Sequence, residues 1–198
     1  MNDTSPPKPI AGTLVLLGCT SVLAAHLAVL YTGGLDPVKT PVSALSHSVD
    51  GNLHGLGLAL FAMAQIALAS LLNDPGAGLP TRLAQLLLIV DAILIVYIAW
   101  RFATFASPTP VLPQADDPLS LLAGGTGLVM GLASPGLLRR HRPAGLWNLA
   151  CLGLWVALTP LALAVDTSWV GAYERLVGVV FVAWAAGLAT LLGFRAAR

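Results

Sequence analysis

The sequence contains few charged residues: only 10% of its 198 residues are Asp, Glu, Lys or Arg, whereas 57% are hydrophobic. Soluble domains carry about 25% charged residues, so this composition excludes an ordinary soluble domain. The apolar residues are also gathered into blocks rather than spread evenly. Runs of about 20 residues with almost no charge recur, and this length crosses roughly 30 Å of hydrocarbon. The chain is therefore predicted to be an all-α membrane protein.

Cysteine is nearly absent as well. Cys19 and Cys151 both fall inside apolar runs, and neither belongs to a CxxC pair or to a zinc-ligand set. Thiols in such runs usually serve as small packing residues. The apolar run after Lys8 is too long for a signal peptide and lacks a small-x-small cleavage site, so we interpret it as the first spanning helix.

Six apolar runs predict one six-helix transmembrane domain, a polytopic bundle over residues 1–198. Turn-forming or basic segments separate several of the runs, notably NDPGAGLP at residues 73–80, a proline-rich segment at 106–118 and RRHRPAG at 139–145. The spanning helices are predicted at about residues 10–31, 53–72, 81–103, 119–138, 145–165 and 174–193.

Charge asymmetry predicts the orientation of this bundle. With six crossings, both termini share one side with the loops near residues 73–80 and 139–145. The basic residues on that side are Lys8, Arg82, Arg139, Arg140, Arg142, Arg195 and Arg198. The other side has only the basic residues Lys39, Arg101 and Arg175, together with the acidic residues Asp36, Asp50, Asp116, Asp117, Asp166 and Glu174. Because Lys and Arg are enriched in cytoplasmic loops, we expect both termini in the cytoplasm.

The stretch between the first two runs, DPVKTPVSALSHSVDGNLH at residues 36–54, holds most of the side chains able to do chemistry. A Thr-Pro pair at residues 40–41 is typical of a helix start. At helical spacing, one side of the next turns is apolar and the other carries Ser43, His47 and Asp50. We therefore expect a short amphipathic surface helix at the outer face.

Ser43, His47 and Asp50 are also the residue types of a hydrolytic triad, and with His54 they are the catalytic candidates. Ser43 and His47 are four residues apart and could touch on one helix, but no oxyanion hole is identifiable. A polar helix face that closes the end of the bundle explains the same residues. Both interpretations stay open.

Asp91 is the most costly residue to bury, since it falls near the middle of the third apolar run. An ionised carboxylate there costs roughly 2.5–3.5 kcal/mol on insertion scales, so it must be protonated, paired or turned toward a polar cavity. Candidate partners at similar depth are Cys19, Thr20, Ser21, Gln65, Thr126 and Trp155. Asp91 either carries a proton or binds a ligand, or it forms an interhelical hydrogen bond that only fixes packing.

Other polar groups gather near the outer boundary. Arg101 ends the third run, where it could reach the interface or pair with Glu174 or Asp166. His26 and His54 fall at matched depth on neighbouring helices, a pattern that could hold a haem or a metal ion. A single pair of this kind more often reflects histidines that form hydrogen bonds, so no cofactor is predicted.

Small and basic residues indicate contacts. Gly55 and Gly57 recur in the second run, and Gly127-x-x-x-Gly131 permits close approach of the fourth helix, which we therefore expect near the centre of the bundle. The RRHR cluster at residues 139–142 could touch anionic lipid headgroups at about 1 kcal/mol per residue. Membrane lipids are thus expected partners and a larger membrane protein complex is a further candidate, whereas nucleic acid is not expected.

Two segments resemble a known family. DPVKTPVSALS at residues 36–46 resembles the outer-loop signature of a family of bacterial six-helix membrane proteins, in which an I-S-E-L-G-like stretch follows the first helix. GAYERLVGVVFVAW at residues 171–184 is similar to the opening of that family's sixth helix. The family is known as domain of unknown function nine-nine-eight. The resemblance implies a six-helix bundle in the bacterial inner (plasma) membrane, and it matches the positions of Ser43, Glu174 and Arg175.

This sequence departs from the family pattern at three places. Ala44 stands where the family usually has an acid, and Ser46 stands where it usually has glycine. FATFASP at residues 102–108 replaces a more regular F-P-x-D-like turn. The departures argue against any activity that depends on the missing acids.

Three function classes follow. The favoured class is a non-enzymatic accessory subunit or a binder of a lipid-like molecule, with its polar site at the outer (periplasmic) face. Asp91, Arg101, Glu174 and Arg175 are its ligand-binding or proton-carrying candidates. The alternatives are an intramembrane lipid hydrolase that uses the triad-like residues and His54, and a small proton-coupled transporter that uses Asp91.

Overall fold

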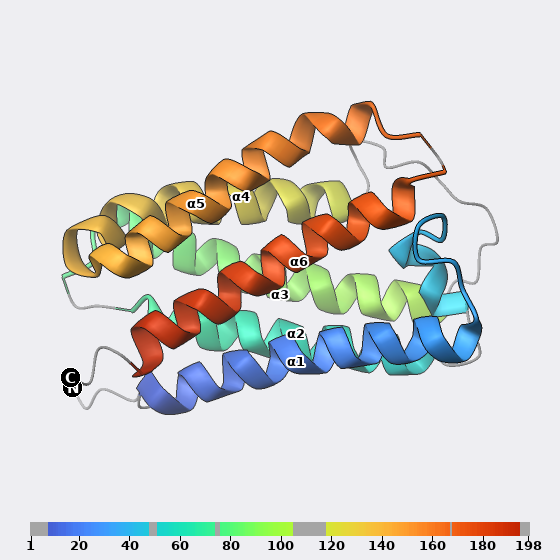
Figure 1. Cartoon of the computed structure of the whole chain (residues 1–198). Helices are drawn as coiled ribbons and strands as arrows, with labels where there is room; N and C mark the ends of the chain where they lie inside the picture. The colour runs from blue at the N-terminus through green and yellow to red at the C-terminus, as the bar shows by residue number, and fades with distance from the viewer. Residues whose placement is uncertain (1–7, 48–50, 74–75, 105–117, 167, 195–198) are drawn as a thin grey trace.

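The structure, a computed structural model, describes residues 8–47, 51–73, 76–104, 118–166 and 168–194. Its helices are α1 (Lys8–Gly33), the 3₁₀ helix η1 (Val42–His47), α2 (Gly51–Leu71), α3 (Leu79–Thr104), α4 (Pro118–Arg140), α5 (Arg142–Leu158), the 3₁₀ helix η2 (Thr159–Leu163), α6 (Val170–Ala189) and the π-helical turn η3 (Thr190–Phe194) (Figure 1). No strand occurs within these residues.

All six long helices are apolar enough to cross a membrane. The predicted all-α bundle of six spanning helices is therefore confirmed, and the chain is a multi-pass membrane protein by length and composition. The predicted helix ends agree with the observed ones to within four residues when η2 and η3 are counted with the helices they continue. This agreement follows from the fixed thickness of the hydrocarbon layer, which sets how long an apolar run must be.

Each helix packs against the next one along the chain, and α6 lies between α1 and α5, so that it closes the bundle (Figure 1). We call one end of the bundle the basic end, because the charged residues that the structure describes there are Lys8, Arg82, Arg139, Arg140 and Arg142. The opposite end, which carries His26 and His54, is the histidine end.

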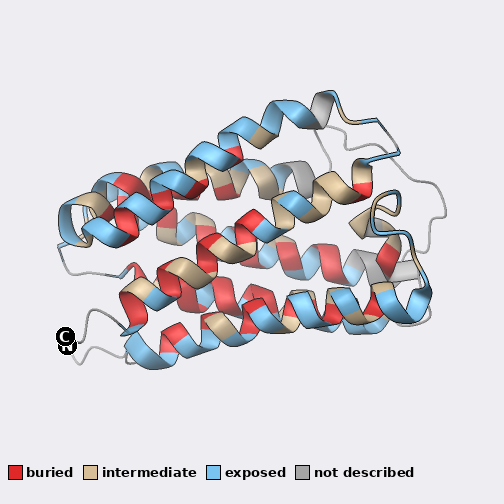
Figure 2. Cartoon of the chain, viewed as in Figure 1, coloured by how far each residue is buried: buried red, intermediate tan, exposed pale blue. Residues whose placement is uncertain are grey.

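The helices turn their buried faces toward one another, as Figure 2 shows in red. Many of the side chains on these faces are alanines, although large ones such as Trp184 and Met130 are also fully buried. Long aliphatic side chains point outward on every spanning helix, among them Leu17, Leu27, Leu56, Met63, Ile93, Leu128, Val156 and Leu176. Lipid tails solvate such side chains well, whereas small residues let the helix backbones approach closely.

Glycines allow α1 and α2 to pack closely against each other. A Cβ added at Gly18 would lie 2.5 Å from the Cβ of Ala64, and one added at Gly57 would lie 2.7 Å from the Cβ of Ala25. The expectation that Gly127-x-x-x-Gly131 brings α4 to the centre is wrong. A Cβ at Gly127 would lie 3.2 Å from the Trp155 ring of α5, but one at Gly131 would have no neighbour within 4 Å, and α4 packs mainly against α3 and α5.

The predicted surface helix is present as η1, and its form is 3₁₀. Leu45 on η1 is fully buried. The helix therefore inserts an apolar side chain into the bundle and contacts α1, α2, α3 and α6. Its contribution is to close the histidine end.

Candidate functional site

The chain leaves α1 at the histidine end through a tight turn. Gly34 has φ +57°, in the left-handed region that favours glycine. The amides of Gly34 and Leu35 donate to carbonyl groups in the last turn of α1. The Asp36 carboxylate then accepts a hydrogen bond from the Val38 amide at 2.9 Å. These contacts direct the segment across the end of the bundle toward α6.

The first turns of α6 hold this segment in place. The Ala172 amide donates to the Val38 carbonyl at 3.0 Å. The Glu174 carboxylate accepts a hydrogen bond from the Val42 amide, at the start of η1. Glu174 is thus engaged in docking the segment. Its sequence-predicted partner, Arg101, has a side chain that lies outside the described residues.

Arg175 completes this attachment. Its Nη1 donates to the carbonyl oxygens of Pro37 and Thr40, each at 2.7 Å. A Cβ at Gly171 would lie 2.3 Å from the Thr40 carbonyl oxygen. Glycine at position 171 therefore allows the segment to come close enough for Arg175 to reach it.

The same guanidinium group reaches into the bundle. Arg175 Nε donates to Nε2 of His26 at 3.1 Å. The ring of His54 lies edge-on against that of His26, with the ring centroids 5.6 Å apart. The structure thus brings together the two histidines that counting along the helices placed at equal depth. It adds Arg175, which the sequence did not connect with either of them.

The guanidinium group fixes the chemistry of this cluster of His26, His54 and Arg175, which we call the histidine cluster. Arginine only donates hydrogen bonds, so His26 Nε2 must accept with its lone pair and carry its proton on Nδ1. A metal ion at Nε2 would have to displace the guanidinium and would be repelled by its charge. The described residues contain no group of three or more potential metal ligands. The arrangement therefore suits an anionic or acceptor-bearing group better than a cation.

Three polar atoms of the histidine cluster are buried without a hydrogen-bond partner in the described part of the chain: Nδ1 and Nε2 of His54, and Nη2 of Arg175. His54 is only 2% exposed. Leaving a buried polar group unpaired costs about 1–3 kcal/mol. Such groups are rare in native proteins and call for an explanation, which is often a functional one.

No family model, curated protein or solved structure matches this chain. The family resemblance of residues 36–46 and 171–184 accordingly stays a prediction. The function of the histidine cluster has to be argued from its geometry.

Asp91 lies apart from the histidine cluster, between α3 and α4. Its Oδ2 accepts a hydrogen bond from the Thr126 hydroxyl at 3.2 Å, and both residues are buried. A Cβ at Gly125 would lie 2.4 Å from Asp91 Oδ1, so the carboxyl group occupies the space that this glycine leaves. Of the partners expected from depth alone, Thr126 is the one that bonds it. This geometry favours a packing contact between two helices, and a proton-carrying role stays a hypothesis.

The triad-like residues cannot be placed as a catalytic group. The side chains of Ser43 and His47, and the whole of Asp50, lie outside the described residues. The backbone of η1 brings Ser43 and His47 to the histidine end, the same end as His54. The hydrolase interpretation is therefore neither supported nor excluded by side-chain geometry.

A second polar cluster, centred on Asn148 of α5, has no counterpart in the sequence prediction. Its amide Nδ2 donates to the Met130 carbonyl at 2.7 Å and to the Ser134 hydroxyl at 2.8 Å. Its Oδ1 accepts from the Trp184 indole at 2.8 Å. Every side-chain polar atom in this cluster is paired, so we assign it to joining α4, α5 and α6. A single asparagine within an apolar run was the signal that could have revealed it.

Proposed function

We propose that this chain is a non-enzymatic membrane protein that binds a lipid-like molecule through a polar headgroup at the histidine end. The observation that supports this most strongly is the buried His54, whose two ring nitrogens have no hydrogen-bond partner among the described residues and lie near Nη2 of Arg175, which has none there either. A ligand that pairs these atoms would recover the cost of burying them without a hydrogen bond.

The cluster also specifies the chemistry of that headgroup. Arg175 Nη2 offers N–H donors, and a neutral imidazole at His54 offers one donor and one acceptor. A matching headgroup presents negatively charged oxygen to the arginine and a hydroxyl or amide hydrogen to the histidine. Charge-assisted hydrogen bonds of this kind are about twice as strong as neutral ones.

A lipid-like ligand fits the surroundings of the cluster. Leu27 directly follows His26 in the sequence, and Leu53 directly precedes His54. Both leucines are exposed. These positions place apolar surface for an acyl or prenyl chain beside a polar cluster. Binding sites of this type combine apolar walls with a few well-placed polar groups.

The membrane and the orientation belong to the same proposal. The basic end faces the cytoplasm, because five basic residues and no acidic residue lie there in the described part of the chain. The histidine end would then face the periplasm, with the chain in a bacterial inner membrane. On the resemblance of residues 36–46 and 171–184, we also propose that the chain belongs to the family known as domain of unknown function nine-nine-eight; an accessory subunit of a larger membrane complex is the other form of the same non-enzymatic role.

Mass spectrometry of the molecules retained by the purified chain tests the proposal. The full-length protein is extracted in a mild maltoside detergent without delipidation, and its bound molecules are quantified per mole of protein. The variants are His54→Leu and, as a matched control, Gln65→Leu. Gln65 also lies on α2, is fully buried and has both side-chain amide atoms unpartnered within the described residues, but it is about three turns away.

One class of molecule is expected to remain with the wild type and with Gln65→Leu. Its retained amount should fall about tenfold or more in His54→Leu, because the headgroup loses its hydrogen bonds to the imidazole. Equal retention by all three proteins would refute a role for His54. A cleaved lipid that accumulates with the wild type only would replace the proposal with the hydrolase alternative.

A further inference from the structure

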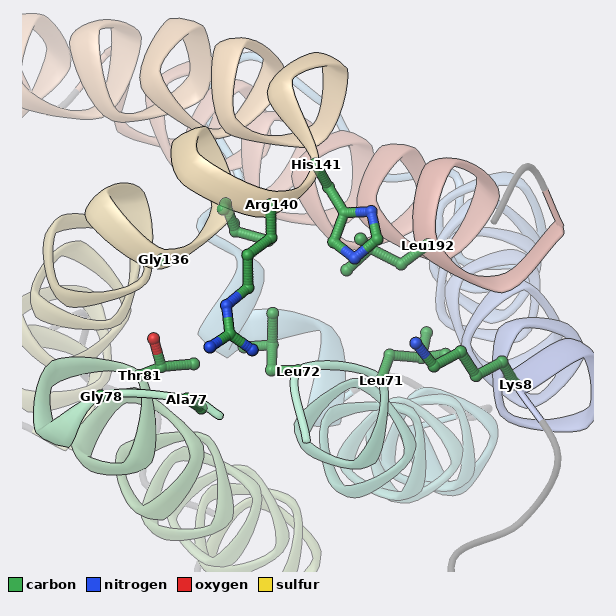
Figure 3. Close-up of a pocket in the computed structure, with 11 residues that line it drawn as sticks. Lys8, Leu71, Leu72, Ala77, Gly78, Thr81, Gly136, Arg140, His141 and Leu192 are labelled. Atoms are coloured by element: carbon green, nitrogen blue, oxygen red, sulfur yellow. The ribbon is translucent and has the colours of Figure 1, made fainter. Parts of the chain in front are cut away.

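A second candidate site lies at the opposite end of the molecule. A cavity of about 40 Å³ opens at the basic end, between the start of α1, the end of α2, the first turn of α3 and the end of α4 (Figure 3). One buried water molecule needs about 10–15 Å³, so this cavity can admit a larger polar group. Leu71, Leu72, Leu137 and Leu192 supply its apolar walls.

Basic side chains line this cavity. Lys8 from α1, Arg140 from α4 and His141 from the junction with α5 all line it, and their side chains converge on it in Figure 3. No acidic residue is among the described residues that line it. The Thr81 hydroxyl, from the first turn of α3, adds a neutral donor. This set of donors suits an anion with several oxygen atoms.

Two glycines leave the space that the polar side chains at this cavity occupy. A Cβ at Gly136 would lie 2.4 Å from the Thr81 hydroxyl oxygen, and one at Gly76 would lie 2.6 Å from Arg140 Nη2. Arg140 also donates a hydrogen bond to the Gly76 carbonyl, which ties the end of α4 to the loop between α2 and α3. Both side chains are thus held by their surroundings, which lowers the entropy cost of binding.

We infer that this cavity binds a phosphate oxyanion, presented by the headgroup of an anionic phospholipid. Arg140 and Lys8 supply charge-assisted hydrogen bonds to the phosphate oxygens, and Thr81 donates a hydroxyl hydrogen. A pocket of basic residues at the end of a helix bundle lies at the depth where lipid phosphates are found. The inference concerns other residues and the other end of the bundle, so it does not depend on the histidine cluster.

Binding can be measured by native mass spectrometry and by thermal stabilisation of the delipidated full chain. The probes are short-chain phosphatidylglycerol, short-chain phosphatidylcholine and inorganic phosphate. The variants are Arg140→Gln, Lys8→Gln and Thr81→Val. The matched control is Arg139→Gln, which removes the same charge from the preceding position of α4 but does not line the cavity.

Phosphatidylglycerol is expected to bind the wild type and Arg139→Gln with affinities within twofold of each other. Arg140→Gln should weaken binding by about tenfold or more, and Lys8→Gln and Thr81→Val by smaller factors. Lys8→Gln and Thr81→Val keep the test valid if Arg140→Gln does not fold. If inorganic phosphate binds at this cavity and the phospholipids do not, the oxyanion site is supported, but its ligand is a soluble phosphate and not a lipid headgroup. Equal losses in Arg139→Gln and Arg140→Gln, or no loss in any variant, would overturn the inference.

Discussion

Replacing His54 with leucine should make the ligand-free protein more stable. In the wild type, both ring nitrogens of His54 are buried without a partner in the described residues. Leucine has no polar atom to desolvate and fills much of the same space, so the substitution should raise the free energy of unfolding by about 1–3 kcal/mol. For a chain of this size, each kcal/mol raises Tm by roughly 2–4 °C. Few substitutions of a fully buried residue are expected to stabilise a protein.

Thermal unfolding in detergent with a thiol-reactive fluorogenic dye measures this effect. Cys19 and Cys151 are both free and buried, so the dye reports the loss of folded structure. Gln65→Leu should stabilise the protein similarly, because it also removes an unpartnered buried amide. The two variants should differ when the retained ligand is added back. Ligand at a hundred times the wild-type Kd would stabilise the wild type and Gln65→Leu by about 2.7 kcal/mol, whereas His54→Leu, with at least tenfold weaker binding, would gain at most about 1.4 kcal/mol.

The outcome that refutes this reasoning is a clear loss of stability in ligand-free His54→Leu. Such a loss would mean that His54 makes hydrogen bonds within the folded chain, and that it is a structural residue. An increase in stability without any difference in ligand response would locate the ligand elsewhere.

Three further predictions concern packing, and all use the same unfolding assay. Gly57→Ala should lower the free energy of unfolding by about 1–3 kcal/mol, because the added Cβ would overlap α1. Gly131→Ala should be neutral or slightly stabilising, since its Cβ would meet no neighbour within 4 Å. Equal effects of the two substitutions would contradict the close approach of α1 and α2. Thr126→Val should lower the free energy of unfolding by about 1–3 kcal/mol, because it removes the hydroxyl that donates to Asp91. Asp91→Asn keeps an acceptor oxygen and should lower the free energy of unfolding by less. The reverse order would show that the charge of the carboxylate matters. Asn148→Leu should destabilise by about 3 kcal/mol or more because it leaves several buried groups unpaired, and a neutral result would show that the cluster is dispensable.

The sequence predicted the helices well because the membrane imposes a strict length and composition on them. It also predicted which polar groups share a depth, since rise per residue is constant along each helix. The pairing of His26 with His54 and that of Asp91 with Thr126 were both among the expected combinations. Depth is therefore readable from an apolar sequence.

The direction in which a residue points around its helix could not be read in the same way. Lipid-facing and core-facing positions are both apolar here, so little amphipathic pattern reveals which face turns inward. For this reason the sequence did not connect Arg175 with His26, and it assigned the close helix approach to Gly127 and Gly131. Of the glycines at the contact between α1 and α2, Gly57 was among those that the sequence indicated, whereas Gly18 is recognisable only once the neighbouring helix is in place.

A crystal structure of protein purified without delipidation would test the central claim most directly. The account predicts non-protein density within hydrogen-bonding distance of the His54 ring nitrogens and of Arg175 Nη2, with an apolar tail that runs along the outside of α1 and α2. It would be contradicted by a structure in which both His54 nitrogens bond to groups of the chain itself and no ligand density lies beside them.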